Sequence, residues 1–470
     1  MNRNKELLKN TAILMVGQFV PKIMALIVLP ILTGSLTKTE YGLYDLTLTV
    51  ASFCIPLVSV QIQQAVFRYL IEKDSKRASI ISSSFIFLIF MSSIASVVII
   101  GGWLYYTKDI ILSILFMLSY VFEMVLSWGG QVARGLGHNI NYSLSYALYS
   151  VCFVIVLLIK YIFFGKLELE YVIVSMIISY GVSIAYLFYS CRIIYFVNVS
   201  EFCKKTVMKL LAFSGPMVIS SVGLWIVNLS DRFCVSGFLG VEMNAVYAVA
   251  NKIPNLINAF YSVFNLAWTE NTSRLTTEEK KKGYYSSFFE EFYALLIGAL
   301  LLLITVSPVL FKVLIDDQYN AAYGLMSWLY IGVLFSSLVS FFGSIYVGEK
   351  KTKEVGISSL LGAVINLLIN IVLMKKYGVI VAAVSTILSY FVILLYRAID
   401  IKKYVNIHYN SIKILIGFCT VIILAVLNNH FSIIRTIISV IIVIVYNYKY
   451  NFYILKRLID KIVRRSIPVK

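Results

Sequence analysis

Two lysines lie inside long apolar segments of the chain. Lys22 is about eleven residues from either end of the segment 10–34, and Lys252 is about ten residues into the segment 242–268. At 1.5 Å per helical residue, Lys22 is roughly 16 Å from either end, too far for its side chain to reach a membrane surface. Asp45 and Glu123 are candidate counter-ions. The lysines therefore predict either structural ion pairs or a hydrated cationic cavity that attracts an anionic head group such as phosphate.

Polar residues recur at helical spacing on four of the apolar segments, which places them on one face of each helix. The segment 242–268 and the residue after it carry Asn244, Tyr247, Asn251, Asn255, Asn258, Ser262, Asn265 and Thr269. The segment 42–67 carries Asp45, Thr49, Ser52, Pro56, Ser59 and Gln63. Shorter stripes are Thr11, Gln18 and Lys22 in 10–34, and Ser214, Ser221, Asn228 and Arg232 in 210–235. Hydrogen bonds between helices would explain one or two such residues each. A stripe along a whole helix favours the lining of a hydrated cavity.

Further charges lie near the ends of predicted helices. Arg68 and Arg134 follow the segments 42–67 and 110–133, where they either fix the topology or form a mouth that captures anions. Asp231 and Arg232 would either pair with each other or contact a ligand. Asp45, Glu123 and Asp231 are also candidates for binding a coupling proton or Na⁺, although no spacing identifies an ion site.

Other chemistries have little support in the sequence. His138, His408 and His430 show no metal-ligand spacing, and the chain has no GxxxxGK[ST] phosphate-binding loop. A membrane polysaccharide polymerase or glycosyltransferase would need a substantial extramembrane loop with catalytic carboxylates. The longest loops on the outer side have about ten residues, and Asp316-Asp317 is their acidic cluster. We expect no metal, no cofactor and no enzymatic activity.

The elements that position these residues are membrane-spanning helices. Hydrophobic residues make up 60% of the 470 residues and charged residues 14%, and the mean hydropathy is +0.86. A bilayer core of roughly 30 Å needs about 20 apolar residues per helix. The predicted fold is an all-α polytopic membrane protein with about fourteen spans. They cover 10–34, 42–67, 79–106, 110–133, 142–164, 169–191, 210–235, 242–268, 287–312, 321–347, 356–375, 379–398, 411–429 and 432–449.

The basic residues predict the orientation of these spans. If the N-terminus is cytoplasmic, about 30 of the 41 lysines and arginines fall on the cytoplasmic side, which predicts that both termini are cytoplasmic. The net charge of +18 therefore lies at the membrane edges. It favours contact with anionic lipids, and we expect no nucleic-acid partner.

The chain also contains a weak internal repeat at an offset of 203 residues. At this offset Leu7-Leu8 aligns with Leu210-Leu211, and Tyr44 with Tyr247. We expect two parallel six-helix lobes, 1–200 and 201–404, followed by two further helices and a basic tail in 405–470. Tandem lobes of this kind suit alternating access around a central site.

The chain resembles the polysaccharide exporters of the multidrug/oligosaccharidyl-lipid/polysaccharide superfamily, specifically the O-antigen flippase group. The resemblance covers nearly the whole chain, and its pieces are short. They are Tyr41-Gly42-Leu43-Tyr44, Arg68, Arg134-Gly135, Asp231-Arg232, Tyr247, Lys252-Ile253, Asn366, Asn370, Tyr377-Gly378, Ala382-Ala383 and Thr386. Two positions depart from the family pattern: Val381 replaces a frequent glycine, and Trp268-Thr269 stands where a proline is frequent.

The resemblance implies the MATE-like fold and flipping of an undecaprenyl-pyrophosphate-linked oligosaccharide, an O-antigen or capsule repeat unit, across the bacterial cytoplasmic (inner) membrane. By position, Lys22, Lys252, Arg68, Arg134 and Arg232 are the candidate pyrophosphate contacts, and Asn251, Asn255 and Asn258 would suit sugar hydroxyls. Other polysaccharide-assembly proteins are candidate partners. A peptidoglycan lipid-precursor flippase and a multidrug antiporter remain alternatives. An antiporter for organic cations would concentrate carboxylates in the membrane. In this chain Lys22 and Lys252 match Glu123 and Asp45 in number, and Arg232 makes the balance positive.

Overall fold

The computed structural model describes residues 3–72, 76–274, 278–349, 351–405, 407–428, 432–452 and 456, and these residues form helices without strands. The α-helices are α1 (Arg3–Ser35), α2 (Lys38–Val58), α3 (Ile62–Leu70), α4 (Arg77–Thr107), α5 (Ile110–Gly135), α6 (Asn139–Phe164), α7 (Leu169–Ser190), α8 (Lys204–Leu239), α9 (Val241–Lys252), α10 (Asn255–Arg274), α11 (Glu278–Leu314), α12 (Ala321–Gly348), α13 (Thr352–Tyr377), α14 (Ile380–Asp400), α15 (Ser411–Leu427) and α16 (Ile433–Tyr450). Short 3₁₀ helices are η1 (Ile193–Tyr195), η2 (Val199–Glu201), η3 (Asp317–Tyr319) and η4 (Ile401–Lys403).

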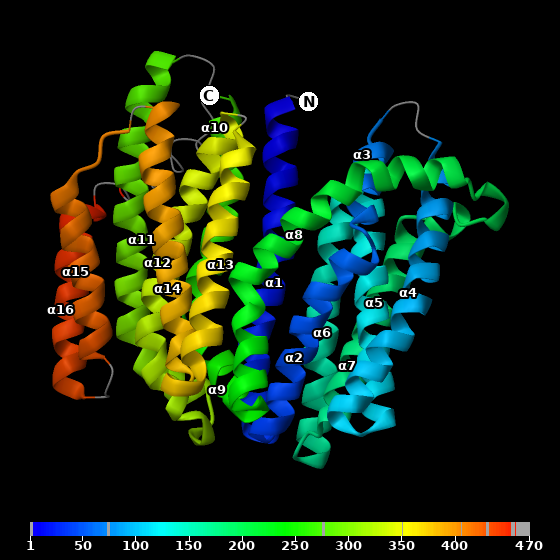
Figure 1. The fold of residues 1–470 in the computed structure, drawn as a ribbon, viewed down its shortest axis with the longest axis horizontal. Coiled ribbons are helices and arrows are strands. Elements are labelled where there is room, and N and C mark those ends of the chain that lie inside the picture. The colour runs from blue at the N-terminus through cyan, green and yellow to red at the C-terminus, as the bar shows by residue number, and fades with distance from the viewer. Residues whose placement is uncertain are drawn as a thin grey trace, which may run out of the picture. The chain divides into compact units, whose positions relative to one another are not determined.

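The chain forms two compact units, Met1–Phe233 and Cys234–Lys470, which divide within α8. In the first unit α5 is central and packs against α3, α4 and α7, while α1 packs along α6. Trp128 of α5 is fully buried, and its indole N–H donates to the Ser84 hydroxyl of α4 at 3.0 Å. Figure 1 shows the first half of α8 crossing this unit, where Lys209 lies 4.4 Å from the ring centroid of Tyr69 in α3.

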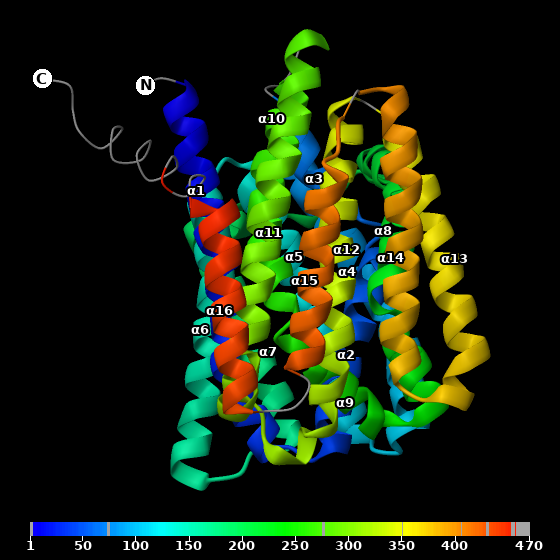
Figure 2. The same ribbon diagram turned by 90° about the vertical axis from the view of Figure 1, so that its left-hand side faces the viewer.

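In the second unit α12 is central and packs against α9, α10, α14 and α15. Its core is aromatic: the ring of Trp268 stacks on Phe288 and Phe341 at centroid distances of 4.2 and 4.7 Å. The C-terminal helices α15 and α16 lie beside α11 (Figure 2). Burial of these large rings gives the unit its own apolar core.

Ten of the described helices are long and apolar enough to cross a membrane. This confirms the prediction of an all-α polytopic membrane protein, while the number fourteen and the lobe boundaries at 200 and 404 stay predictions. Two predicted segments are not single helices. The segment 42–67 is divided into α2 and α3 because Val60 and Gln61 adopt left-handed conformations, with φ of 47° and 55°. The segment 242–268 is interrupted at Ile253 and Pro254, since proline has no N–H for a helical hydrogen bond.

Close packing of α1 on α6 depends on a glycine. A Cβ atom added at Gly17 would lie 2.5 Å from Ser143 Cβ and 2.7 Å from Ser143 Cα, whereas a Cβ atom at Gly34 would meet nothing within 4 Å. We expect Gly17→Ala to lower the free energy of unfolding by about 1–3 kcal/mol, because the helices must move apart. Gly34→Ala is the matched control and should leave the free energy of unfolding unchanged or raise it. Thermal unfolding of both purified variants measures this difference, and equal midpoints would contradict the predicted packing.

Candidate functional site

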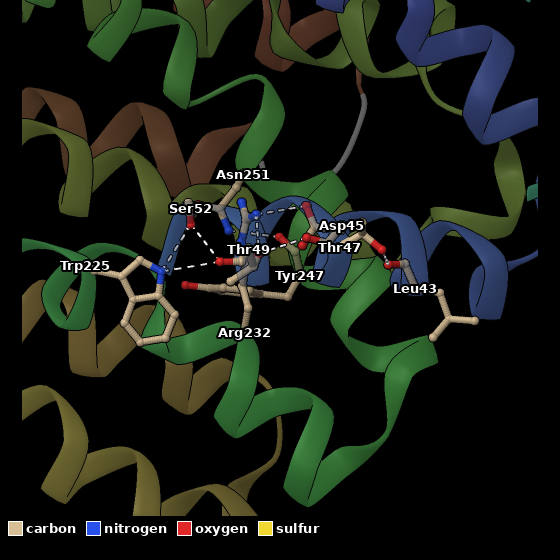
Figure 3. Close-up of polar contacts among 9 residues, drawn as sticks. All are labelled: Leu43, Asp45, Thr47, Thr49, Ser52, Trp225, Arg232, Tyr247 and Asn251. Carbon is tan, nitrogen blue, oxygen red and sulfur yellow. Dashed lines mark hydrogen bonds and ion pairs between the residues drawn. The ribbon is translucent and has the colours of Figure 1, made fainter. Parts of the chain in front are cut away.

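A buried ion pair joins α2 to α8 in the first unit (Figure 3). Arg232 Nη1 lies 2.9 Å from Asp45 Oδ1 and 3.3 Å from Thr49 Oγ1. Asp45 and Thr49 are one turn apart, so α2 presents both oxygens on the same face. The Asp45 side chain is 1% exposed and that of Arg232 17%. Asp45 therefore neutralises Arg232. The sequence had suggested other pairings, with Asp45 as a counter-ion for the lysines and Asp231 as a partner of Arg232.

Trp225 adds a second connection between the same two helices (Figure 3). Its indole N–H lies 3.1 Å from the Ser52 hydroxyl and 3.4 Å from the Thr49 carbonyl oxygen. Its ring lies 4.3 Å from that of Phe53. Three residues of the predicted polar face of α2, Asp45, Thr49 and Ser52, thus contact α8. These contacts give them a structural role whether or not they also contact a ligand.

Arg134, in the last turn of α5, is the cation best placed to bind an anion. Its guanidinium lies 4.5 Å from the ring centroid of Phe67 and 5.3 Å from that of Tyr142. Its Nη1 atom donates to Gln131 Oε1 at 3.2 Å, and Nε is buried without a hydrogen-bond partner among the described residues. No carboxylate in the described part of the chain lies within ion-pair distance of it. The aromatic rings hold the guanidinium in place while several of its donors stay uncommitted.

A buried amide lies on the helix that provides Phe67. Gln63 is one turn before Phe67 and so on the same face of α3. Its side chain is 5% exposed, and its Oε1 atom has no hydrogen-bond partner among the described residues. Buried polar atoms normally have partners, so an unpaired one indicates a site that a ligand or water completes. The Gln63 oxygen needs a donor, so it does not itself bind an anion. We take Arg134 and Gln131 together as the candidate anion site.

The other predicted cations lie in different surroundings. Lys22 is half-buried on α1, the helix that packs along α6. Arg68 is exposed and forms an ion pair with Glu72 at 3.3 Å. Lys252 is half-buried at the end of α9 in the second unit, directly before the interruption at Ile253 and Pro254.

The predicted asparagine face belongs to the second unit and is divided between α9 and α10. Asn251 donates to the Tyr247 carbonyl oxygen at 2.9 Å, within its own helix. Asn255 is exposed at the start of α10 and accepts a hydrogen bond from Asn258 at 2.8 Å. The Asn258 oxygen also accepts from Ser336 at 3.5 Å. Asn255 is therefore the member of this trio that offers the most surface to solvent or ligand.

The predicted coupling carboxylates lie in the first unit. Asp231 is 3% exposed in α8, next to Arg232. Glu123 is half-buried midway along α5. Unlike Asp45, Glu123 has no lysine, arginine or histidine within ion-pair distance in the described part of the chain.

The residues that surround Arg134 cannot be found from the sequence alone. Phe67, Gln131 and Tyr142 come from three different helices, so no spacing in the sequence brings them together. A weaker signal was present in α6, where Tyr142, Tyr146 and Tyr149 follow at intervals of four and three residues. Such spacing places three phenol hydroxyls on one helix face.

Comparison with known proteins identifies two matching families. The family described as polysaccharide biosynthesis protein matches residues 7–269, more than half of the chain, and the MatE family matches residues 216–372. An uncharacterized membrane protein of Methanocaldococcus jannaschii is 22% identical over 439 residues, which cover 86% of this chain and 85% of the relative.

Solved structures of similar fold are membrane transporters. The structure of the lipid II flippase MurJ in an inward closed conformation has a TM-score of 0.68 at 15% identity, covering 95% of this chain and all of the other. A multidrug resistance MATE family transporter in an outward-facing conformation has a TM-score of 0.58 at 14% identity, with coverages of 84% and 95%. At these identities the likeness concerns the fold.

Proposed function

Because this chain belongs to the polysaccharide biosynthesis protein family, we propose that it is a flippase for a lipid-linked oligosaccharide. Its substrate is an undecaprenyl-pyrophosphate-linked glycan, an O-antigen or capsule repeat unit, which it moves from the cytoplasmic to the outer leaflet. The protein works in the cytoplasmic (inner) membrane of a bacterium with both termini in the cytoplasm. It uses no cofactor and breaks no covalent bond, so it is not an enzyme.

The observation that carries this proposal is Arg134. A guanidinium at a helix end, which lies over two aromatic rings and has no carboxylate partner in the part of the chain that the structure describes, suits a doubly charged head group. Arginine presents a planar fork of N–H donors that matches two phosphate oxygens at once. Gln131 supplies an amide group beside it. Such a site favours pyrophosphate over an organic cation.

In the proposed cycle the pyrophosphate first binds Arg134 from the inner leaflet. Lys22 and Lys252 then neutralise it inside the membrane, and the two units rock to release it on the outer side. Asn251, Asn255 and Asn258 contact the sugar hydroxyls. Arg232 contributes to pyrophosphate movement only indirectly, since its charge is balanced by Asp45. Arg68, exposed and paired with Glu72, contributes to the potential that attracts anions.

The alternatives predict different phenotypes on depletion of the protein in its native bacterium. We expect surface polysaccharide to disappear while its lipid-linked precursor accumulates and growth continues. Arrest of cell-wall synthesis would instead indicate a peptidoglycan lipid-precursor flippase, and sensitivity to organic cations with normal surface polysaccharide would indicate a multidrug antiporter. Quantifying the precursor in lipid extracts, with rescue by the wild-type gene as control, separates these three results.

A further inference from the structure

A pocket in the second unit lies where α11 packs against the two C-terminal helices, α15 and α16 (Figure 2). Its empty space of about 290 Å³ is partly open to the surface, so a small chemical group can enter it from outside. Six of the lining side chains combine charge with aromatic rings. They are Phe289, Glu290 and Tyr293 of α11, Lys413 of α15, and Tyr446 and Tyr450 of α16.

The pocket lies at the end of the apolar part of all three helices. Glu290, Lys413 and Lys449 each stand within two residues of a long stretch without charged side chains. These stretches are 292–311, 414–427 and 436–448. Uncharged stretches lie in the bilayer core, whereas the charges that flank them lie at the level of the lipid head groups. The pocket therefore opens at head-group level, on the side that the lysines and arginines predict to be cytoplasmic.

The charged part of the pocket is an ion pair that a ligand can separate. Lys413 Nζ lies 2.6 Å from Glu290 Oε2, and the two side chains are 46% and 39% exposed. Exposed ion pairs contribute little to stability, so their separation costs little. The contact also shows that Glu290 accommodates a primary ammonium group. When the ammonium group of a ligand takes this place, Lys413 becomes available for an anion.

The uncharged wall of the pocket is largely aromatic. Phe289, Tyr293 and Tyr446 are buried, and the rings of Tyr446 and Tyr450 lie 4.8 Å apart. Aromatic rings attract cations through their negative faces, so a carboxylate beside several rings suits an ammonium group. A second lysine lies near the rim, since Lys449 Nζ is 5.3 Å from the ring centroid of Tyr450. It adds positive charge where an anion would bind Lys413.

These charges favour a head group that carries both signs. A purely anionic head group would be attracted by Lys413 but repelled by Glu290 beside it. A phosphoethanolamine group supplies an ammonium for Glu290 and a phosphate for Lys413, so each charge gains a partner. A choline group also carries both signs, but its quaternary nitrogen has no N–H to donate to the carboxylate.

We propose that this pocket binds the phosphoethanolamine head group of a membrane phospholipid, with Glu290 holding the ammonium and Lys413 the phosphate. The lipid is a resident of the surrounding membrane and not the transported substrate, so the proposal does not rest on the proposed function. A head group bound there contacts α11 and α15 at once and strengthens the attachment of the C-terminal helices.

Native mass spectrometry of the full chain in detergent tests this site. The protein is titrated with phosphatidylethanolamine, phosphatidylcholine and phosphatidylglycerol of identical acyl chains. The wild type should bind phosphatidylethanolamine more tightly than either of the others by roughly two- to fivefold, the contribution of one exposed charge pair. Equal affinity for the three lipids, or a preference for phosphatidylglycerol, would overturn the proposal.

Two variants assign the preference to this pocket. Glu290→Gln removes the ammonium partner and frees Lys413, so the preference should reverse toward phosphatidylglycerol. Lys413→Ala should weaken binding of phosphatidylethanolamine. Lys160→Ala is the matched control, because Lys160 also lies over an aromatic ring, that of Phe164, but in the first unit. It should bind all three lipids as the wild type does. If Glu290→Gln keeps the wild-type preference, the head group binds elsewhere and the proposal is wrong.

Discussion

Arg134→Ala should weaken binding of inorganic pyrophosphate by at least about 100-fold and stop export of the lipid-linked glycan. Two charge-assisted hydrogen bonds at about 1.5–3 kcal/mol each are lost with the guanidinium, and each 1.4 kcal/mol is a factor of ten. Arg134→Lys keeps the charge but loses the planar fork, so an intermediate loss of roughly tenfold is expected. Isothermal titration calorimetry on the purified variants measures these affinities.

Arg68→Ala is the matched control for this substitution. Arg68 also lies near a helix end in the first unit, but its side chain is 54% exposed and already paired with Glu72. Exposed ion pairs contribute little, so its removal should change pyrophosphate affinity by no more than about threefold. Equal losses in the two variants would mean that general positive potential, rather than the aromatic-held guanidinium of Arg134, attracts the anion.

Asp45→Asn should lower the free energy of unfolding by about 2–4 kcal/mol. It leaves the Arg232 guanidinium without its partner in a buried site, and breaking one side of a buried pair costs more than the pair itself contributes. We expect the lower part of the known range, because 17% of the Arg232 side chain remains exposed. Arg232→Gln should have a similar effect. Thermal unfolding in detergent measures both.

The double variant Asp45→Asn/Arg232→Gln should recover most of this loss, since it removes both charges and leaves two amides able to hydrogen-bond. As a control, Lys413→Ala breaks the ion pair with Glu290 at 2.6 Å, in which the two side chains are 46% and 39% exposed. It should cost at most about 1 kcal/mol. If the double variant is as unstable as the sum of the single ones, Asp45 and Arg232 stabilise the fold independently of each other.

The membrane-spanning helices were predictable because the length of each apolar segment indicates a span. The points at which two of these helices are interrupted were not predictable. Nothing in the composition near Val60 and Gln61 signals a left-handed turn, since residues other than glycine, asparagine and aspartate rarely adopt it. The hydroxyl of Ser59 completes this turn by accepting from the Gln61 backbone N–H at 3.2 Å. Pro254 was a visible signal, but the regular spacing of asparagines on both sides of it favoured a single helix.

The site was predictable in its residue types and not in its pairings. The charges of Asp45 and Glu123 within predicted spans, and of Arg134 at the end of one, stand out in the sequence. Their partners depend on tertiary structure, because Asp45 and Arg232 are 187 residues apart. Among the described residues Arg134 differs from Arg68 in its partner: Arg68 pairs with Glu72, four residues further along the chain, whereas no carboxylate pairs with Arg134.

Translocation in reconstituted vesicles tests the proposed function most directly. An undecaprenyl-pyrophosphate-linked oligosaccharide is placed in one leaflet, and its arrival in the other is followed with an impermeant glycosidase. We expect vesicles with the wild-type protein to transfer the lipid, and those with Arg134→Ala to transfer it no faster than protein-free vesicles. If the wild-type protein leaves the lipid in its original leaflet, under conditions where it binds pyrophosphate, it is not a flippase for this substrate.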